Sequence, residues 1–265
     1  MLSRLCCLAL TITVSAHAQS PTRANVAYGT HERQVLDFWQ AKSEQVKTPL
    51  LFFIHGGGWV NGDKANPDFL AKCLENGISV VSINYRLIAD AQAAKIDPPV
   101  KACLDDAARA LQFVRSKAEA WGIDKERIGG CGGSAGGFTA LWLAFAPDMA
   151  DARSADPVSR ESTRLRCVMA FVTQTTLDPQ QMQAWIPNNE YGNHAFGLPG
   201  MADFIAKREA LLPWIERFSP YALASADDPP VLLFYDNPPA LGQPYKDPPH
   251  SGNYGAGIAE KLKAA

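Results

Sequence analysis

The sequence shows no strong charge imbalance and no long hydrophobic run beyond its N-terminus. The formal net charge of the 265 residues is −2, which provides neither a basic surface for nucleic acid nor an acidic tail. After the N-terminal region, no segment reaches the roughly 20 apolar residues that a membrane-spanning helix needs. These absences argue against a nucleic-acid-binding or membrane-spanning protein and favour a small, nearly neutral partner.

Cysteine is sparse, and no spacing of cysteine or histidine predicts a metal site. Two of the six cysteines lie in the N-terminal apolar run, and the other four are far apart. A domain of this size does not need disulfides, so bridges and buried free thiols are equally good interpretations. The sequence leaves open the state of Cys73, Cys103, Cys131 and Cys167.

The first residues have the pattern of a secretory signal peptide. Arg4 precedes an apolar run over residues 5–14, and the small-x-small sequence AHA follows at residues 16–18. The apolar run is too short to span a bilayer as a helix. We therefore expect cleavage after Ala18, which removes residues 1–18 and gives a secreted or periplasmic protein.

Apolar runs alternate with helical patterns along residues 19–265, as is typical of an α/β sheet. Alternating runs at 25–28 and 34–39 predict strands that open a mixed sheet. Apolar runs predict buried strands at 50–54, 79–83, 167–172 and 231–235, and a further short strand is predicted at 127–131. Helical spacing predicts helices at 67–74, 100–121, 138–145, 201–215 and 255–264. The fold class predicted is a single doubly wound, mostly parallel sheet.

Residues 175–220 break this rhythm, and we interpret them as a cap or lid insertion. They carry two tryptophans, several amides, and scattered glycine and proline around one helical piece. Sugars are commonly held by aromatic faces mixed with amides, which makes a carbohydrate ester a candidate substrate. A merely well-packed lid would have the same composition.

The segment GGSAG at residues 132–136 makes Ser134 the candidate nucleophile. It matches G-x-S-x-G and lies between a predicted strand and a predicted helix, which is the context that the motif requires. Small residues flank the serine because the strained turn leaves no room for side chains. A glycine-rich turn of this kind also cradles phosphate in other proteins, but no G-K-[ST] follows here.

The segment HGGGW at residues 55–59 predicts an oxyanion hole at the end of the first central strand. Consecutive glycines let backbone N–H groups approach a substrate carbonyl, and one such donor is typically worth about 3 kcal/mol in the transition state. The candidate donors are the N–H groups of Gly57, Gly58 and Ala135. We expect His55 and Trp59 to border the substrate pocket, with His55 holding the loop by hydrogen bonding; its alternative role is that of a catalytic base.

With HGGGW and GGSAGG in this order, the chain resembles α/β-hydrolase esterases and lipases of the HGGG (hormone-sensitive-lipase-like) and feruloyl-esterase-like groups. Shorter matching pieces are GDK at 62–64, NYRL at 84–87, the aspartate pair at 105–106 and WGID at 121–124. The resemblance covers roughly residues 26–264. It implies an α/β-hydrolase fold and hydrolysis of carboxylic esters, often acyl esters of plant polysaccharides, without a cofactor.

The acid and the histidine of the catalytic triad that the resemblance implies are not clearly identified in the sequence. An acid and then a histidine should follow the nucleophile. Asp236 comes directly after the last predicted strand and is the preferred acid, with Asp247 as a poorer candidate. Only His194 and His250 follow Ser134, and His250 is the preferred base.

The last strand and helix of the α/β-hydrolase fold are missing from the expected order, because the sequence ends with the helix predicted at 255–264. Three explanations stay open: a C-terminally truncated form of an active enzyme, which we favour; an enzyme in which His250 has taken over the role of base; or a catalytically incomplete ligand- or carbohydrate-binding module. A serine peptidase on the same fold is a more distant alternative, because its substrate-binding elements are not recognisable.

Overall fold

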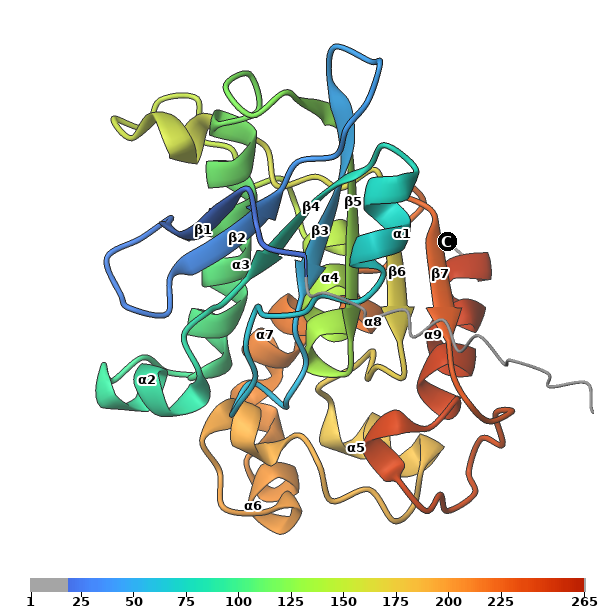
Figure 1. Ribbon diagram of the computed structural model, residues 1–265. Helices are drawn as coiled ribbons and strands as arrows, with labels where there is room; N and C mark the ends of the chain where they lie inside the picture. The colour runs from blue at the N-terminus through green and yellow to red at the C-terminus, as the bar shows by residue number, and fades with distance from the viewer. Residues whose placement is uncertain (1–18, 265) are drawn as a thin grey trace, which may run out of the picture.

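The computed structural model describes residues 19–264, which form a seven-stranded sheet with helices packed against it (Figure 1). The signal peptide expected at residues 1–18 lies outside the described residues. The strand order is β1-β2-β4-β3-β5-β6-β7; β1, β2 and β4 are paired antiparallel, and the pairs from β4 through β3, β5 and β6 to β7 are parallel. The strands are β1 (Arg23–Ala27), β2 (Val35–Trp39), β3 (Thr48–Ile54), β4 (Ser79–Ile83), β5 (Ile123–Gly133), β6 (Cys167–Phe171) and β7 (Val231–Phe234).

The predicted α/β architecture is confirmed, and every predicted strand is present. Strand β4 is buried along its whole length. The expectation of a buried strand at 231–235 is wrong for one face, because β7 exposes Leu232 and Phe234 at alternate positions. Strand β5 begins four residues before its predicted start, since Ile123 already pairs with Thr48 on β3. In the described part of the chain, β7 lies at one edge of the sheet.

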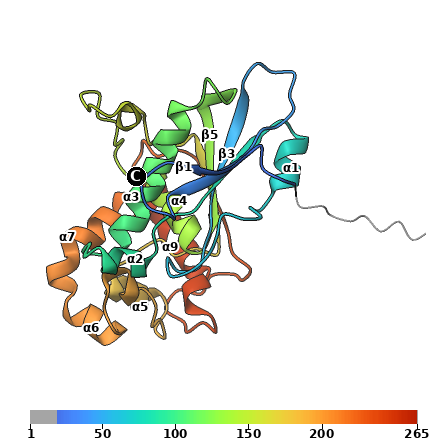
Figure 2. The same cartoon turned by 60° about the vertical axis from the view of Figure 1, so that its left-hand side comes forward.

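The helices are α1 (Leu70–Glu75), α2 (Ile88–Ala93), α3 (Val100–Ser116), α4 (Ala135–Phe145), α5 (Pro179–Trp185), α6 (Met201–Ala206), α7 (Arg208–Phe218), α8 (Pro220–Leu223) and α9 (Asn253–Ala264). Every residue of α4 is buried, because this helix packs on β5 and β6 and is covered by α3 and α8. Figure 2 shows α3, α4 and α7 on one side of the sheet and α1 on the other.

Two helix predictions differ from the structure, and three short helices are additional to those expected. The helix expected at 100–121 ends at Ser116, because the chain then tightens into bonds three residues apart, such as Ala118 N–H to Arg115 C=O at 3.1 Å. The single helix expected at 201–215 is two helices that meet at Lys207. Helices α2, α5 and α8 match no expected helix, because four to seven residues are too few for a clear hydrophobic period.

The segment between β6 and β7 contains α5, α6, α7, α8 and the 3₁₀ turn η2 (Asn193–Phe196). Figure 1 shows α5, α6 and the loop that follows β7 together at the carboxyl ends of the central strands. Ligands of open parallel sheets bind at this end. Within residues 19–264, no helix is both long and apolar enough to cross a membrane.

Candidate active site

Ser134 occupies a strained turn between β5 and α4. Its backbone angles are φ 51° and ψ −125°, a conformation that residues with a side chain rarely adopt. The Ser134 N–H donates to the carbonyl of Phe171 at 2.9 Å, which fixes the turn against β6. A Cβ atom on Gly136 would lie 2.1 Å from the carbonyl oxygen of Ile54. The second glycine of the motif is therefore required by close backbone contact.

His250 lies against Ser134, although 116 residues separate them in the chain. The distance from His250 Nε2 to Ser134 Oγ is 3.0 Å, and Nδ1 lies 2.7 Å from Oδ2 of Asp247. A carboxylate accepts hydrogen bonds, so Nδ1 carries the proton and Nε2 is free to accept the hydroxyl proton. The three side chains thus have the geometry of a nucleophile, a general base and an orienting acid.

The carboxylate bound to His250 is that of Asp247, and no hydrogen bond joins Asp236 to His250 among the described residues. The preference for Asp236 over Asp247 therefore differs from the observed pairing. Asp247 directly precedes the 3₁₀ turn η3 (Pro248–His250), and this turn brings residues three apart onto the same side. The signal for this in the sequence is D-P-P-H at 247–250, since a proline pair readily starts such a turn.

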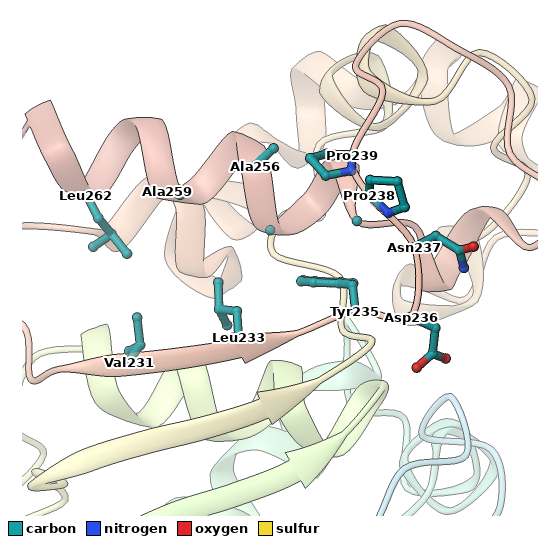
Figure 3. Close-up of a pocket in the computed structure, with 12 residues that line it drawn as sticks. Val231, Leu233, Tyr235, Asp236, Asn237, Pro238, Pro239, Ala256, Ala259 and Leu262 are labelled. Carbon is teal, nitrogen blue, oxygen red and sulfur yellow. The ribbon is translucent and has the colours of Figure 1, made fainter.

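Asp236 is exposed at the end of β7, beside a groove of about 670 Å³ between β7 and α9 (Figure 3). Apolar side chains line this groove, including Val231 and Leu233 from the strand and Leu262 from the helix. Neither Ser134 nor His250 borders it. The groove is therefore separate from the candidate catalytic residues.

The HGGGW loop lies directly against the serine turn. A Cβ atom on Gly56 would come within 2.7 Å of the Gly133 carbonyl oxygen, so only glycine permits this contact. Gly57 and Gly58 have φ values of 98° and 61°. Within residues 19–264, the N–H groups of Gly57, Gly58 and Ala135 donate no hydrogen bond to the protein. Unpaired N–H groups beside the nucleophile are available to a developing oxyanion.

Trp59 and His55, which were expected to border the substrate pocket, are both buried in the loop. The side chain of Trp59 is fully buried, packs edge-on against Phe138 and donates from Nε1 to Thr139 Oγ1 at 3.1 Å. Trp59 therefore anchors the loop to α4 and does not line an open pocket. His55 is 5% exposed, and its Nδ1 donates to the Gly56 carbonyl at 2.8 Å. Burial lowers the pKa of His55, although its hydrogen bond to Gly56 opposes this.

His194, the other histidine after Ser134, supports the oxyanion loop from the segment between β6 and β7. Its Nε2 lies 3.0 Å from the Gly58 carbonyl and donates to it. Its ring also stands edge-on to Tyr191, with ring centroids 4.7 Å apart. Burial lowers the pKa of His194, and the hydrogen bond to Gly58 partly offsets that effect.

The shorter motif pieces brace the site at a distance. Lys64 forms a buried ion pair with Asp37 at 3.0 Å. The Arg86 guanidinium donates twice to Asp106, at 2.9 and 2.6 Å, and that carboxylate is nearly inaccessible. Bidentate geometry of this kind fixes the orientation of the chain. These contacts support structural roles for the charged residues.

The four cysteines of the described residues are free thiols. Cys103 and Cys131 are buried, and burial raises the pKa of the Cys131 thiol to about 12. Residues 19–264 contain no group of three or more histidine, cysteine, aspartate or glutamate side chains arranged to hold a metal ion.

The mixed sheet, with its strained serine turn at the carboxyl edge, places the protein in the α/β-hydrolase class. A solved structure described as a truncated form of a carbohydrate esterase from gut microbiota has the same fold, with a TM-score of 0.69 and 20% identity over 92% of this chain and 83% of that one. The chain belongs to the BD-FAE family, whose model matches residues 36–238. The resemblance to esterases inferred from HGGGW and GGSAGG is thereby confirmed.

Two curated relatives come from Mycobacterium tuberculosis. Esterase LipC is 31% identical over 124 residues, which cover 46% of this chain and 29% of that protein. The probable carboxylic ester hydrolase LipM is 28% identical over 222 residues, which cover 80% of this chain and 46% of that protein. The chain thus matches less than half the length of either relative.

Proposed function

We propose that this protein is a serine carboxylic-ester hydrolase that works through an acyl-enzyme. The observation that carries the proposal is the contact of 3.0 Å between His250 Nε2 and Ser134 Oγ, with Asp247 bound to the opposite ring nitrogen. Membership of the BD-FAE family and the esterases among the relatives support the same reaction. A catalytically incomplete binding module is not favoured, because a histidine base lies within reach of the serine.

The reaction follows from these positions. Ser134 Oγ attacks the ester carbonyl while His250 Nε2 takes its proton, and the N–H groups of Gly57, Gly58 and Ala135 stabilise the tetrahedral oxyanion. His250 then gives the proton to the leaving alcohol. A water molecule, deprotonated by the same nitrogen, releases the acid and restores the serine. Asp247 keeps the ring in the required tautomer and stabilises its protonated form.

The substrate class that we propose is an acyl ester of a carbohydrate. The solved structure from gut microbiota is described as a carbohydrate esterase, and the segment between β6 and β7 places the rings of Tyr191 and His194 beside the oxyanion loop. We also infer that residues 1–18 direct export and are cleaved after Ala18. N-terminal sequencing of protein recovered from the culture medium or periplasm tests this, and an intact Met1 in that fraction would contradict it.

The activity is tested with p-nitrophenyl acetate and a fluorophosphonate probe. Wild type should release p-nitrophenol and be labelled at Ser134, whereas Ser134→Ala and His250→Ala should each lose activity by about 10³-fold or more. His31→Gln, a histidine change at a loop position between β1 and β2, is the control and should retain activity. Unlabelled wild type, or unchanged turnover in Ser134→Ala, would overturn the proposal.

The substrate class needs a separate comparison. We expect kcat/KM to be higher for acetyl esters of oligosaccharides than for acetyl esters of simple alcohols, because the sugar gains contacts that a small alcohol lacks. Equal values for the two sets would leave a general esterase and contradict the carbohydrate assignment.

A further inference from the structure

We propose that Gln174, together with Thr173, is a positioning residue that sets the distance between the base His250 and the nucleophile Ser134. This inference rests on the proposed function, because it gives both residues a role in the same acyl-transfer site. The two positioning residues lie just after the end of β6; Thr173 contacts the backbone of Ser134, and Gln174 contacts the backbone of Pro249, the residue before His250.

The loop that carries Asp247 and His250 needs external support. Residues 235–252 connect β7 to α9, and η3 is their helical turn among the described elements. A connection of this length does not hold a side chain at a fixed position by its own backbone bonds. Its tethers come from other elements: the side chain of Asn188 pairs with the backbone of Tyr245 at 2.8 and 2.9 Å.

Gln174 holds the peptide group that carries His250. Its Nε2 donates to the carbonyl of Pro249, and its side chain is 1% exposed, so water does not replace the contact. The N–H of the same peptide group belongs to His250 and donates to the Asp247 carbonyl at 3.0 Å. Both polar groups of this peptide plane are therefore occupied, and the direction in which the imidazole leaves the backbone is fixed.

Thr173 holds the backbone of the nucleophile in the same way. Its fully buried hydroxyl lies 2.9 Å from the Ser134 carbonyl oxygen and 3.0 Å from that of Gln174, and its single proton is shared between these two acceptors. The Ser134 N–H is bound by the Phe171 carbonyl, two residues earlier on the same strand segment. Residues 171–174 thus fix both sides of Ser134 and, through Gln174, the peptide before His250.

Stability alone does not explain an amide at position 174. Gln174 Oε1 is buried and has no hydrogen-bond partner within residues 19–264, which is unfavourable for a polar atom. A methionine of similar length would avoid that unfavourable burial. The group that only an amide supplies here is the Nε2 donor, and its acceptor lies next to the catalytic histidine.

The test is Gln174→Met, which keeps the length of the side chain and removes the donor. Gln112→Met is the matched control, because Gln112 is also buried and donates from Nε2 to backbone carbonyls, the nearest being Glu161 at 2.9 Å, but it lies on α3. We expect Gln174→Met to lower kcat by about 10- to 100-fold with KM little changed, since misplacement of a reacting group by about 1 Å has effects of this size. The rate of fluorophosphonate labelling should fall by the same factor.

A purely structural role predicts a different outcome. Both variants would then lose thermal stability while the folded protein kept its kcat and its labelling rate. That result for Gln174→Met, or a change confined to KM, would overturn the positioning role. Should Gln174→Met not fold, Thr173→Val removes only the hydroxyl donor and should lower kcat by about 3- to 10-fold for the same reason; an unchanged kcat would contradict the proposal.

The two proposals fail in distinguishable ways. If Ser134→Ala is inactive and Gln174→Met is as active as wild type, the ester hydrolase stands and the positioning role falls. If wild type neither turns over esters nor reacts with the probe, the proposed function itself falls.

Discussion

Asp247 and His250 lie at the two ends of one short helical turn, and Asp247 Oδ2 is 2.7 Å from Nδ1 of His250. One turn therefore carries both the acid and the base. A single loop after β7 supplies both groups to Ser134. The contacts that position this loop therefore also position Asp247 and His250 relative to Ser134.

Replacement of Asp247 by asparagine should reduce kcat by on the order of 10²- to 10⁴-fold, because an amide at this position permits the wrong tautomer of His250. Asp236→Asn is the matched control, since that carboxylate is exposed and forms no hydrogen bond with His250 among the described residues, and its kcat should stay within about threefold of wild type. Steady-state kinetics on p-nitrophenyl acetate measure both. A larger loss in Asp236→Asn would restore Asp236 as the acid.

The two adjacent glycines before Ser134 should respond very differently to alanine. A Cβ atom on Gly132 would lie 2.6 Å from the carbonyl oxygen of Ile54, whereas the nearest atom to a Cβ on Gly133 is 3.8 Å away. We expect Gly132→Ala to lower the free energy of unfolding by at least about 2 kcal/mol and Gly133→Ala to change it by less than about 0.5 kcal/mol. Urea denaturation provides the comparison, and equal stabilities would show that the turn relaxes.

Loss of the buried carboxylate of Asp106 should destabilise the fold strongly. It accepts hydrogen bonds from Gln34 and from the backbone and side chain of Arg86, so Asp106→Ala leaves a partly buried guanidinium unpaired. We expect a loss of about 3 kcal/mol in the free energy of unfolding. Asp105→Ala is the control: its partner is the half-exposed Lys101, and a loss below about 0.5 kcal/mol is expected. Similar losses in the two variants would contradict the prediction.

Stability should fall as the pH drops below about 6.5, the usual value for histidine. Burial lowers the pKa of His55 and of His194 in the folded state, so the unfolded chain binds more protons in this range. Stability therefore rises with pH through this window and is fully present above it. Chemical denaturation at pH 5.5 and 7.5 measures the difference, and His194→Gln, which keeps a donor near Gly58, should reduce it. An undiminished difference in that variant would exclude His194 as a contributor.

Much of the fold was readable from local patterns. Continuous apolar runs fixed the central strands because a parallel sheet covered by helices requires them, and β4 and β6 appear where the runs do. Element ends were less accurate: α3 stops five residues early because its last bonds tighten, and the break between α6 and α7 leaves no clear trace in the hydrophobic period.

In the candidate site too, features that depend on neighbouring residues were predictable and long-range contacts were not. The placement of Ser134 and the conformations of Gly57 and Gly58 follow from steric demands within a few residues, and such demands are recorded in the local sequence. The partner of His250 is different, because Asp236 and Asp247 both lie in one proline-rich loop. Only the path of that loop decides which carboxylate reaches the imidazole.

The sequence by itself therefore determined the α/β architecture, the serine turn and the glycine-rich loop, because each depends on hydrophobic period or on backbone sterics over a short span. Tertiary structure alone decided that the His250 imidazole contacts the Ser134 hydroxyl and that Asp247 is the carboxylate bound to that imidazole. It also decided that the Gln174 amide donates to the carbonyl of Pro249, next to His250. Those contacts join segments far apart in the chain through single hydrogen bonds, and no local pattern encodes the direction of a side chain across such a distance.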